Sequence, residues 1–190
     1  MIDIYVPAKK RYHLAHGFFK HISKEGELLW RADNMPNIWC DEGELVMLTS
    51  LFAGSYANYG TTPLGKWNLY VGLGTQAPAE GNTLAQVTGE QSPAYGYARQ
   101  PLVVYDDGTA GKDWVITQPA AAYQAASKTI TFTASGGAWS AVTCCFLCTH
   151  PTATTSGQYT RLLCEIALST SRTLQNGDSL QVSLVIGLSE

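Results

Sequence analysis

The sequence has little charge and no long apolar run. Charged residues make up 14% of its 190 residues, against about a quarter in ordinary globular proteins. This composition argues against a long-helix protein, which would be rich in Glu, Lys and Arg, and against disorder caused by charge repulsion. No run of 18 consecutive apolar residues occurs, so we expect no transmembrane helix and no membrane partner. The N-terminus lacks a basic region followed by an apolar core, so we expect no secretory signal.

What the sequence does contain favours short strands joined by turns. Hydrophobic residues make up 45% of the chain, which also has 18 glycines. Apolar and polar residues alternate in several segments after residue 63, most clearly in residues 180–188. Turn signals such as Asn176-Gly177 separate these segments. The pattern predicts a mainly β fold over residues 37–190, an antiparallel β-sandwich of the jelly-roll-like kind.

One short helix is expected near the start of this body, over residues 41–54. Asp41 can cap its N-terminus, and Glu44 stands where a capping box needs an acidic partner. Apolar residues recur at helical spacing after it, and Gly54 can end the helix. We expect the apolar side of this helix to pack on a sheet.

Residues 1–36 are expected to form an extended N-terminal arm outside the body. Residues 1–31 hold six of the twelve basic residues and three of the fifteen acidic ones, so they carry +3 while the remainder carries −6. A basic arm on an acidic body suggests a partner with an acidic surface; a solvated tail with accidental charge is an equal alternative. Deletion of residues 1–31 is therefore expected to leave the body folded. The arm residues expected to contact a partner are Lys9, Lys10, Arg11, Tyr12, Phe18, Phe19 and Lys20.

Tyrosines in stretches rich in Gly, Asn and Pro form a second group of candidate contact residues. They are Tyr56, Tyr59, Tyr95 and Tyr97. An equal interpretation is that they seal an end of the sandwich, and exposed rings of this kind could also stack on carbohydrate. Residues 75–96 form a long excursion, and loops of that length are usually functional or contact a partner.

The five cysteines do not have the spacing of a zinc site. Cys145 and Cys148 form one C-x2-C pair, whereas zinc ribbons need two. Strand alternation places Cys144 and Cys148 on one face and Cys145 on the other, so the three cannot share one metal. We expect buried thiols in a central strand, as befits an odd number of cysteines in a reducing compartment. A crosslink through Cys40 or Cys164 stays open.

No other constellation indicates chemistry. His13, His16 and His21 lie near one another in sequence, but no carboxylate or cysteine completes a metal site with them. The acidic residues of the body are scattered, and no pairing suited to acid–base catalysis follows from their spacing. The body is acidic, so a specific nucleic-acid partner is not expected. We predict that the protein is not an enzyme and needs no cofactor.

Five motifs, in order along residues 37–188, resemble a family of small structural proteins of tailed bacteriophages and prophages. The motifs are Asn37-Ile38 with Gly43 and residues 48–52, residues 69–75 (LYVGLGT), residues 96–100 (GYARQ), residues 130–132 with 137–139, and residues 168–178 (LSTSRTLQNGD). Residues 1–36 and the cysteines of residues 144–148 fall outside the resemblance.

The resemblance implies a virion component made in the bacterial cytoplasm rather than an enzyme. From it we expect a capsid decoration or cement protein, which binds the major capsid protein and copies of itself, as a homotrimer, and stabilises the shell. The alternative is a tail, baseplate or head-fibre module that attaches to glycans on the host surface.

Overall fold

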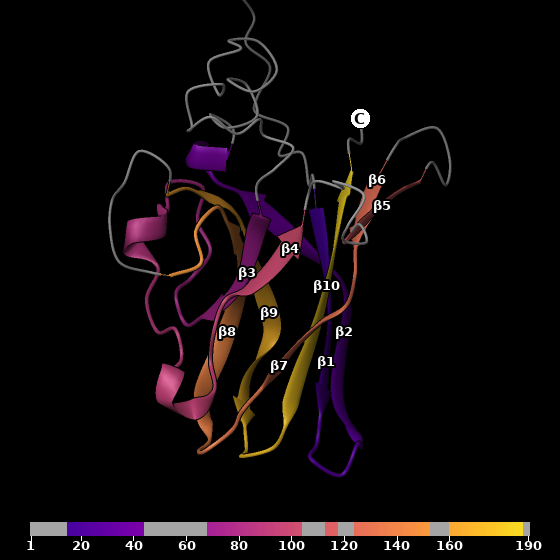
Figure 1. Ribbon diagram of the computed structural model, residues 1–190. Helices are drawn as coiled ribbons and strands as arrows, with labels where there is room; N and C mark the ends of the chain where they lie inside the picture. Colours follow the sequence, from indigo (N-terminus) through magenta and orange to yellow (C-terminus); the bar gives the residue numbers. More distant parts are fainter. Residues whose placement is uncertain (1–14, 44–67, 104–112, 118–123, 153–159, 188–190) are drawn as a thin grey trace, which may run out of the picture.

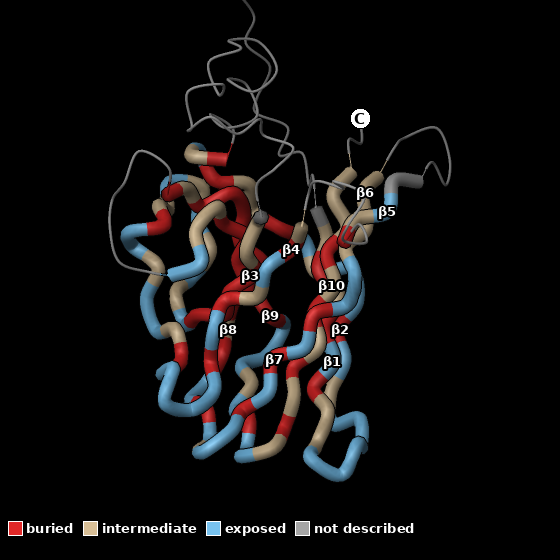
Figure 2. Tube along the Cα trace, in the orientation of Figure 1, coloured by how far each residue is buried: buried red, intermediate tan, exposed pale blue. Residues whose placement is uncertain are grey.

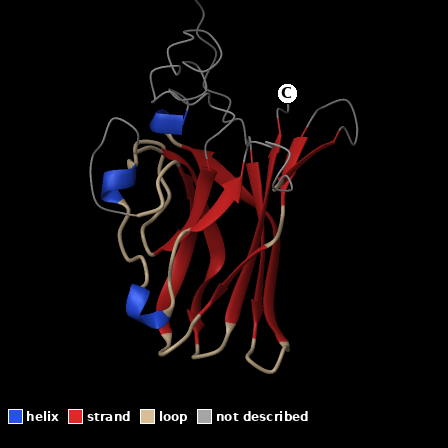
Figure 3. Cartoon of the chain, in the orientation of Figure 1, coloured by secondary structure: helices blue, strands red, loops and turns tan. Residues whose placement is uncertain are grey.

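The computed structural model describes residues 15–43, 68–103, 113–117, 124–152 and 160–187. Within these ranges the chain is mostly antiparallel β-structure, which confirms the expected mainly β, sandwich-like fold (Figures 1 and 3). The described strands are β1 (Ala15–Ile22), β2 (Leu28–Trp39), β3 (Asn68–Gly74), β4 (Gln100–Val103), β5 (Trp114–Thr117), β6 (Gln124–Ser127), β7 (Ile130–Thr133), β8 (Trp139–Cys148), β9 (Leu162–Leu174) and β10 (Ser179–Gly187). Two short 3-10 helices, η4 (Leu84–Gln86) and η5 (Pro93–Tyr95), interrupt the excursion between β3 and β4.

The strands form one strongly bent sheet in the order β4-β3-β8-β9-β2-β1-β10-β6-β5, with β7 also paired to β10. Strand β2 joins its two halves, because residues 28–36 pair with β1 whereas residues 37–39 pair with β9. We call the half made of β5, β6, β7, β10, β1 and the first part of β2 sheet A. The other half, made of the end of β2 with β9, β8, β3 and β4, is sheet B. Every pairing among the described strands is antiparallel.

The main core lies between the two sheets, and buried residues recur along most of the strands that enclose it (Figure 2). In β10 the alternation is regular: Leu180, Val182 and Leu184 are buried. Tyr97 closes the space between the halves. Its ring stacks on Phe132 of sheet A at 6.2 Å between centroids and meets Trp139 of sheet B edge-on at 5.6 Å. Both arrangements are favoured aromatic geometries, so this trio fixes the spacing of the two sheets.

A second, smaller cluster lies on the outer face of sheet B, under residues 75–99. Its members are Cys40, Leu84, Phe146, Cys148 and Leu162. Strand β8 is therefore covered on both faces, which explains why its second half is a continuous apolar run rather than an alternating one.

Short turns join the strands at one end, which we call the turn end. It contains residues 23–27, 134–137 and 175–178. The side chain of Asp178 connects two of these turns: one oxygen accepts a hydrogen bond from the backbone N–H of Lys24 at 3.1 Å, and the other lies 3.2 Å from Nε2 of His21. Backbone hydrogen bonds between Ala134 and residues 177–178 add the third turn.

The structure corrects the boundary expected at residue 36. Strand β1 pairs with β10 along its whole length, and β2 lies between β1 and β9, so both are central strands of the sheet. Residues 15–36 are thus part of the body and not of an arm. Phe18 and Phe19 are neighbours on opposite faces of β1, as in any half-buried strand, so only one of them faces outward.

The helix expected over residues 41–54 is described only at its start. Residues 41–43 are helical, and residues 44–54 lie outside the described residues. Among the residues that the structure describes, no helix is long and apolar enough to cross a membrane.

Candidate functional site

A fully buried carboxylate holds the start of the excursion on sheet B. Glu165, on β9, points to the outer face and accepts hydrogen bonds from Nε2 of Gln76 at 2.8 Å, the backbone N–H of Ala79 at 3.2 Å and Nδ2 of Asn82 at 2.7 Å. A buried carboxylate needs such donors to offset the loss of hydration. The three bonds therefore fix the course of residues 76–82.

Glu42 fastens the next part of the same segment. Its Oε2 accepts hydrogen bonds from the backbone N–H groups of Leu84, at 3.2 Å, and Leu162, at 2.9 Å. Nη1 of Arg161 lies 3.4 Å from the other oxygen. One side chain thus links the first described turn after β2 with η4 and the start of β9.

The third anchor is a two-point ion pair between Arg99 and Glu90. Nε and Nη2 of Arg99 donate to the two carboxylate oxygens at 2.9 and 2.7 Å, and Nη1 donates to the backbone oxygen of His150 at 3.0 Å. The guanidinium also lies 5.1 Å from the centre of the Phe146 ring. Burial tends to lower the pKa of Arg99, but the hydrogen bonds to Glu90 raise it above its ordinary value.

The Tyr97 hydroxyl belongs to the same network. It donates to Oε1 of Glu90 at 2.7 Å and accepts from the backbone N–H of Leu73 at 2.9 Å. Burial, followed by the charge of Glu90, raises the pKa of Tyr97 well above its ordinary value. Tyr97 and Arg99 of the GYARQ motif are therefore used to hold the chain's own loop, and Tyr97 is not available as a surface contact.

The neighbouring LYVGLGT motif is also structural. A Cβ on Gly72 would lie 2.2 Å from the ring of Phe146. The glycine lets the ring pack directly on the backbone of β3 and complete the outer cluster. Both motifs are thus explained by the packing of residues 75–99 on sheet B.

All five cysteines are buried and free. Cys145 faces the main core, while Cys148 faces the outer cluster, which confirms that strand alternation separates them. Burial is the largest cause of their raised pKa values, about 12 for Cys144 and Cys164 and about 11 for Cys148. Such thiols are poor nucleophiles near neutral pH. In the described part of the chain, no group of three His, Cys, Asp or Glu residues is placed to hold a metal ion.

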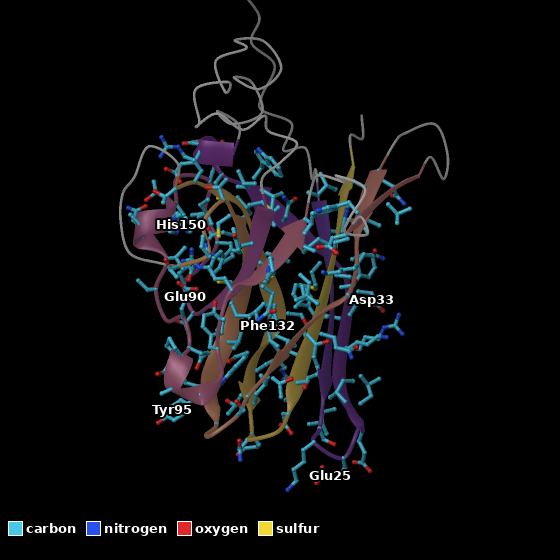
Figure 4. All side chains as sticks on the ribbon, viewed as in Figure 1. Glu25, Asp33, Glu90, Tyr95, Phe132 and His150 are labelled. Atoms are coloured by element: carbon cyan, nitrogen blue, oxygen red, sulfur yellow. The ribbon has the colours of Figure 1, made fainter. Side chains whose placement is uncertain are left out.

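A different kind of feature lies on the outer face of sheet A, away from the anchored segment. A cavity of about 60 Å³ opens there beside Phe18. The polar residues that line it are Lys20, Asp33, Thr129, Gln181 and Ser183. They come from β1, β2 and β10 and from the link between β6 and β7. In the view of Figure 4, Asp33 lies on the side of the molecule opposite Glu90 and Tyr95. We call this feature the Phe18 hollow.

A β-bulge shapes the hollow. Gly17 pairs with Met35 and Phe19 pairs with Ala32, so two residues of β2, Asp33 and Asn34, stand opposite the single residue Phe18. Asn34 has φ +54°, a left-handed conformation that is uncommon outside glycine. The bulge brings Asp33 into the lining of the same cavity as Phe18.

The structure separates the residues expected to contact a partner into three groups. Phe18 and Lys20 line the Phe18 hollow, and Tyr95 is 43% exposed at the turn end. Phe19 and Tyr97 are buried in the core, so the prediction that they lie on a contact surface is wrong. The others, which lie outside the described residues, are Lys9, Lys10, Arg11, Tyr12, Tyr56 and Tyr59.

Sequence reasoning missed the remaining residues of the hollow. Asp33 and Gln181 are single polar residues within strands, and only the cross-strand register brings them beside Phe18. The pair Asp33-Asn34, which interrupts an otherwise strand-like segment, was the one local signal of a bulge.

The described residues thus form a bent antiparallel sheet whose buried charges hold its own loops. Residues 57–185 match the family described as Podophage GP4 fiber I protein gp80. The match covers more than half of the 190 residues, and the chain belongs to this family. It is a structural protein of a tailed-phage virion. No curated protein matches the chain.

Proposed function

We propose that this chain is a subunit of a fibre on the phage particle and that it acts by adhesion. The observation that carries the proposal is the family match, because the family is described as a fibre protein and the match includes strands β3 to β10 and the anchored segment on the outer face of sheet B. The capsid decoration role expected from the sequence stays a prediction, and so does the major capsid protein as its partner.

The architecture supports a module that is rigid when displayed outside the particle. Sheet B is covered on both faces, and Glu42, Glu90 and Glu165 fasten the covering segment at three places. Detachment of the loop at any of these places would leave a carboxylate without its hydrogen-bond donors, which is costly in a buried position. A fibre subunit made outside the assembly and then exposed to solvent benefits from such a self-contained core.

The sheet edges also suit ordered assembly. Among the described strands, β4 and β5 end the strand order, and β4 contains the exposed Pro101. A proline on an edge strand limits uncontrolled pairing with other chains. We infer that copies associate through side-chain surfaces, as the homotrimer expected from the sequence would require.

Copy number per particle tests the proposal. Quantitative mass spectrometry of purified virions gives the ratio of this chain to the major capsid protein. A fibre subunit is present in a small number of copies set by its attachment points. A ratio close to one copy per capsid subunit would instead identify a decoration protein and overturn the fibre assignment, and absence from the particle would overturn both.

A further inference from the structure

We propose that the Phe18 hollow is a subsite for one sugar ring of a bacterial surface polysaccharide. The inference rests on the proposed fibre function, which places the chain where it would meet such a polymer, and it assigns the ligand to the outer face of sheet A. Phe18 would contact the apolar face of the ring, and the polar residues around it would bind the hydroxyl groups.

The first support is the isolation of the aromatic ring. Phe18 is half-buried and stands among polar outward side chains, with Ser183 directly across the β1–β10 pair and Lys20 two residues along β1. A protein-binding anchor usually lies within a wider apolar patch. A single aromatic face with a polar rim matches a sugar ring, which has C–H groups on its face and hydroxyls at its edge.

The second support is the supply of uncommitted hydrogen-bonding groups. Among the described residues, the side chains of Lys20, Thr129, Gln181 and Ser183 have no hydrogen-bond or ion-pair partner. Together they offer ammonium and amide donors, an amide acceptor and two hydroxyls that can do either. Sugar hydroxyls both donate and accept hydrogen bonds, so they need this mixture. An anion would need donors alone, and a cation would need acceptors alone.

The third support is the orientation of Asp33. Nε of Arg31 lies 2.9 Å from Oδ1 and 2.7 Å from Oδ2 of Asp33, which holds the carboxylate in place. The bulge at Asn34 positions it beside Phe18 at the cost of a left-handed backbone. Strained bulges are over-represented where a strand re-aims a side chain at a functional site. A carboxylate oriented in this way can accept hydrogen bonds from a pair of sugar hydroxyls.

The size of the hollow sets the expected affinity. A cavity of about 60 Å³ accommodates part of one sugar ring and not a whole oligosaccharide. A single site is therefore weak, with a dissociation constant on the order of 1 mM for a monosaccharide. Several copies in one fibre would bind a repetitive polymer much more tightly, because each later contact is intramolecular.

The test uses the full chain and two kinds of probe. An array of bacterial O-polysaccharides identifies a polymer that binds, and amide NMR titration with its repeat-unit oligosaccharide locates the site. We expect shifts in residues 17–20, 33–34 and 180–183. Phe18→Ala and Gln181→Ala should each weaken binding by about tenfold or more. Glu27→Gln and Asn176→Ala, polar exposed changes at the turn end, should leave it unchanged. Gln181→Ala is decisive if Phe18→Ala does not fold.

Three results would overturn the subsite: no polysaccharide binds, the shifts map to another face, or both hollow variants bind as the parent does. Loss of self-association in Phe18→Ala, with the chain still folded, would show that the hollow is a contact between copies and would also overturn it. These outcomes are separate from the fibre assignment, because copy number on the virion is measured without any sugar. A chain found in fibres that binds no polysaccharide would refute the subsite alone.

Discussion

Arg99 and Glu90 lie nine residues apart and form a two-point ion pair, with N–O distances of 2.9 and 2.7 Å. The Arg99 side chain is 1% exposed and that of Glu90 is 14% exposed. The pair is therefore largely removed from solvent, and water compensates poorly for a lost partner.

Removing one member of this pair should destabilise the fold strongly. Arg99→Ala leaves the Glu90 carboxylate with the Tyr97 hydroxyl and no cation, and it takes a cation from the Phe146 ring, so the free energy of unfolding should fall by about 3–5 kcal/mol. Urea denaturation measures the change. The matched control is Arg31→Ala. Arg31 also forms an ion pair, with Asp33, but both side chains are exposed, so this variant should lose less than about 1 kcal/mol of unfolding free energy. Equal losses in the two variants would contradict the structural role of Arg99.

Substitution of Gly72 should destabilise the fold in proportion to the clash it creates. In Gly72→Ala the new methyl group meets the Phe146 ring, and overpacking of this kind costs about 1–3 kcal/mol. Phe146→Leu should recover part of the loss when it is combined with Gly72→Ala. The control is Gly81→Ala, because nothing lies within 4 Å of the Cβ that it would add. Thermal melts of Gly72→Ala, the double variant and Gly81→Ala check the prediction, and a melting temperature unchanged in Gly72→Ala would refute the packing argument.

The buried cysteines should make stability fall in alkaline solution. Folding raises the pKa of Cys148 to about 11 and those of Cys144 and Cys164 to about 12, from 9.0. The folded state therefore holds these protons more tightly than the unfolded state, so their contribution is complete below pH 9 and is lost as pH rises from 9 towards 12. Urea midpoints at pH 8, 9.5 and 10.5 should decrease in that order. The urea midpoint should fall less steeply with pH in a Cys144→Ala/Cys148→Ala variant. An equally steep fall in the variant and the parent would show that other groups cause it.

The same burial predicts how the thiols react. Iodoacetamide at pH 8 should modify none of the five cysteines in the folded chain and all five in urea. A Ser171→Cys variant supplies an exposed thiol on β9 as the positive control. Mass spectrometry counts the modified residues, and rapid labelling of a native cysteine would mean that its strand opens readily.

Two N-terminal deletions should behave differently. Deleting residues 1–14 removes none of the described strands, so the chain should keep its β-sheet circular dichroism and cooperative melt. Deleting residues 1–31 removes β1 and part of β2, which lie between β10 and β9, so that variant should not fold. A cooperative melt for the second deletion would mean that β1 is dispensable and would restore the idea of a separate arm.

Much of the fold could be predicted because its local signals agree. The alternation in β10 and the turn at Asn176-Gly177 specify a strand and its start without reference to the rest of the chain. Strand alternation in β8 correctly placed Cys145 and Cys148 on opposite faces of a central strand. Strand β6, with the sequence QAAS, has too few apolar residues to show any period.

The wrong predictions concern residues whose environment is set by residues far away in the sequence. Charge asymmetry suggested an arm, but charge at exposed positions such as Lys20 says nothing about what the alternate residues pack against. Tyr97 is surrounded by turn residues in sequence, and only the positions of Glu90 and Leu73 show that its hydroxyl is satisfied inside. The Phe18 hollow depends on the register of three strands and a bulge, none of which has a sequence signature of its own.

Direct labelling of the chain on the virion is the most direct test of its assignment to a fibre. A gold-conjugated antibody against the purified chain, imaged on intact particles by electron microscopy, should mark projecting fibres and leave the capsid surface bare. Uniform labelling of the shell would contradict the account.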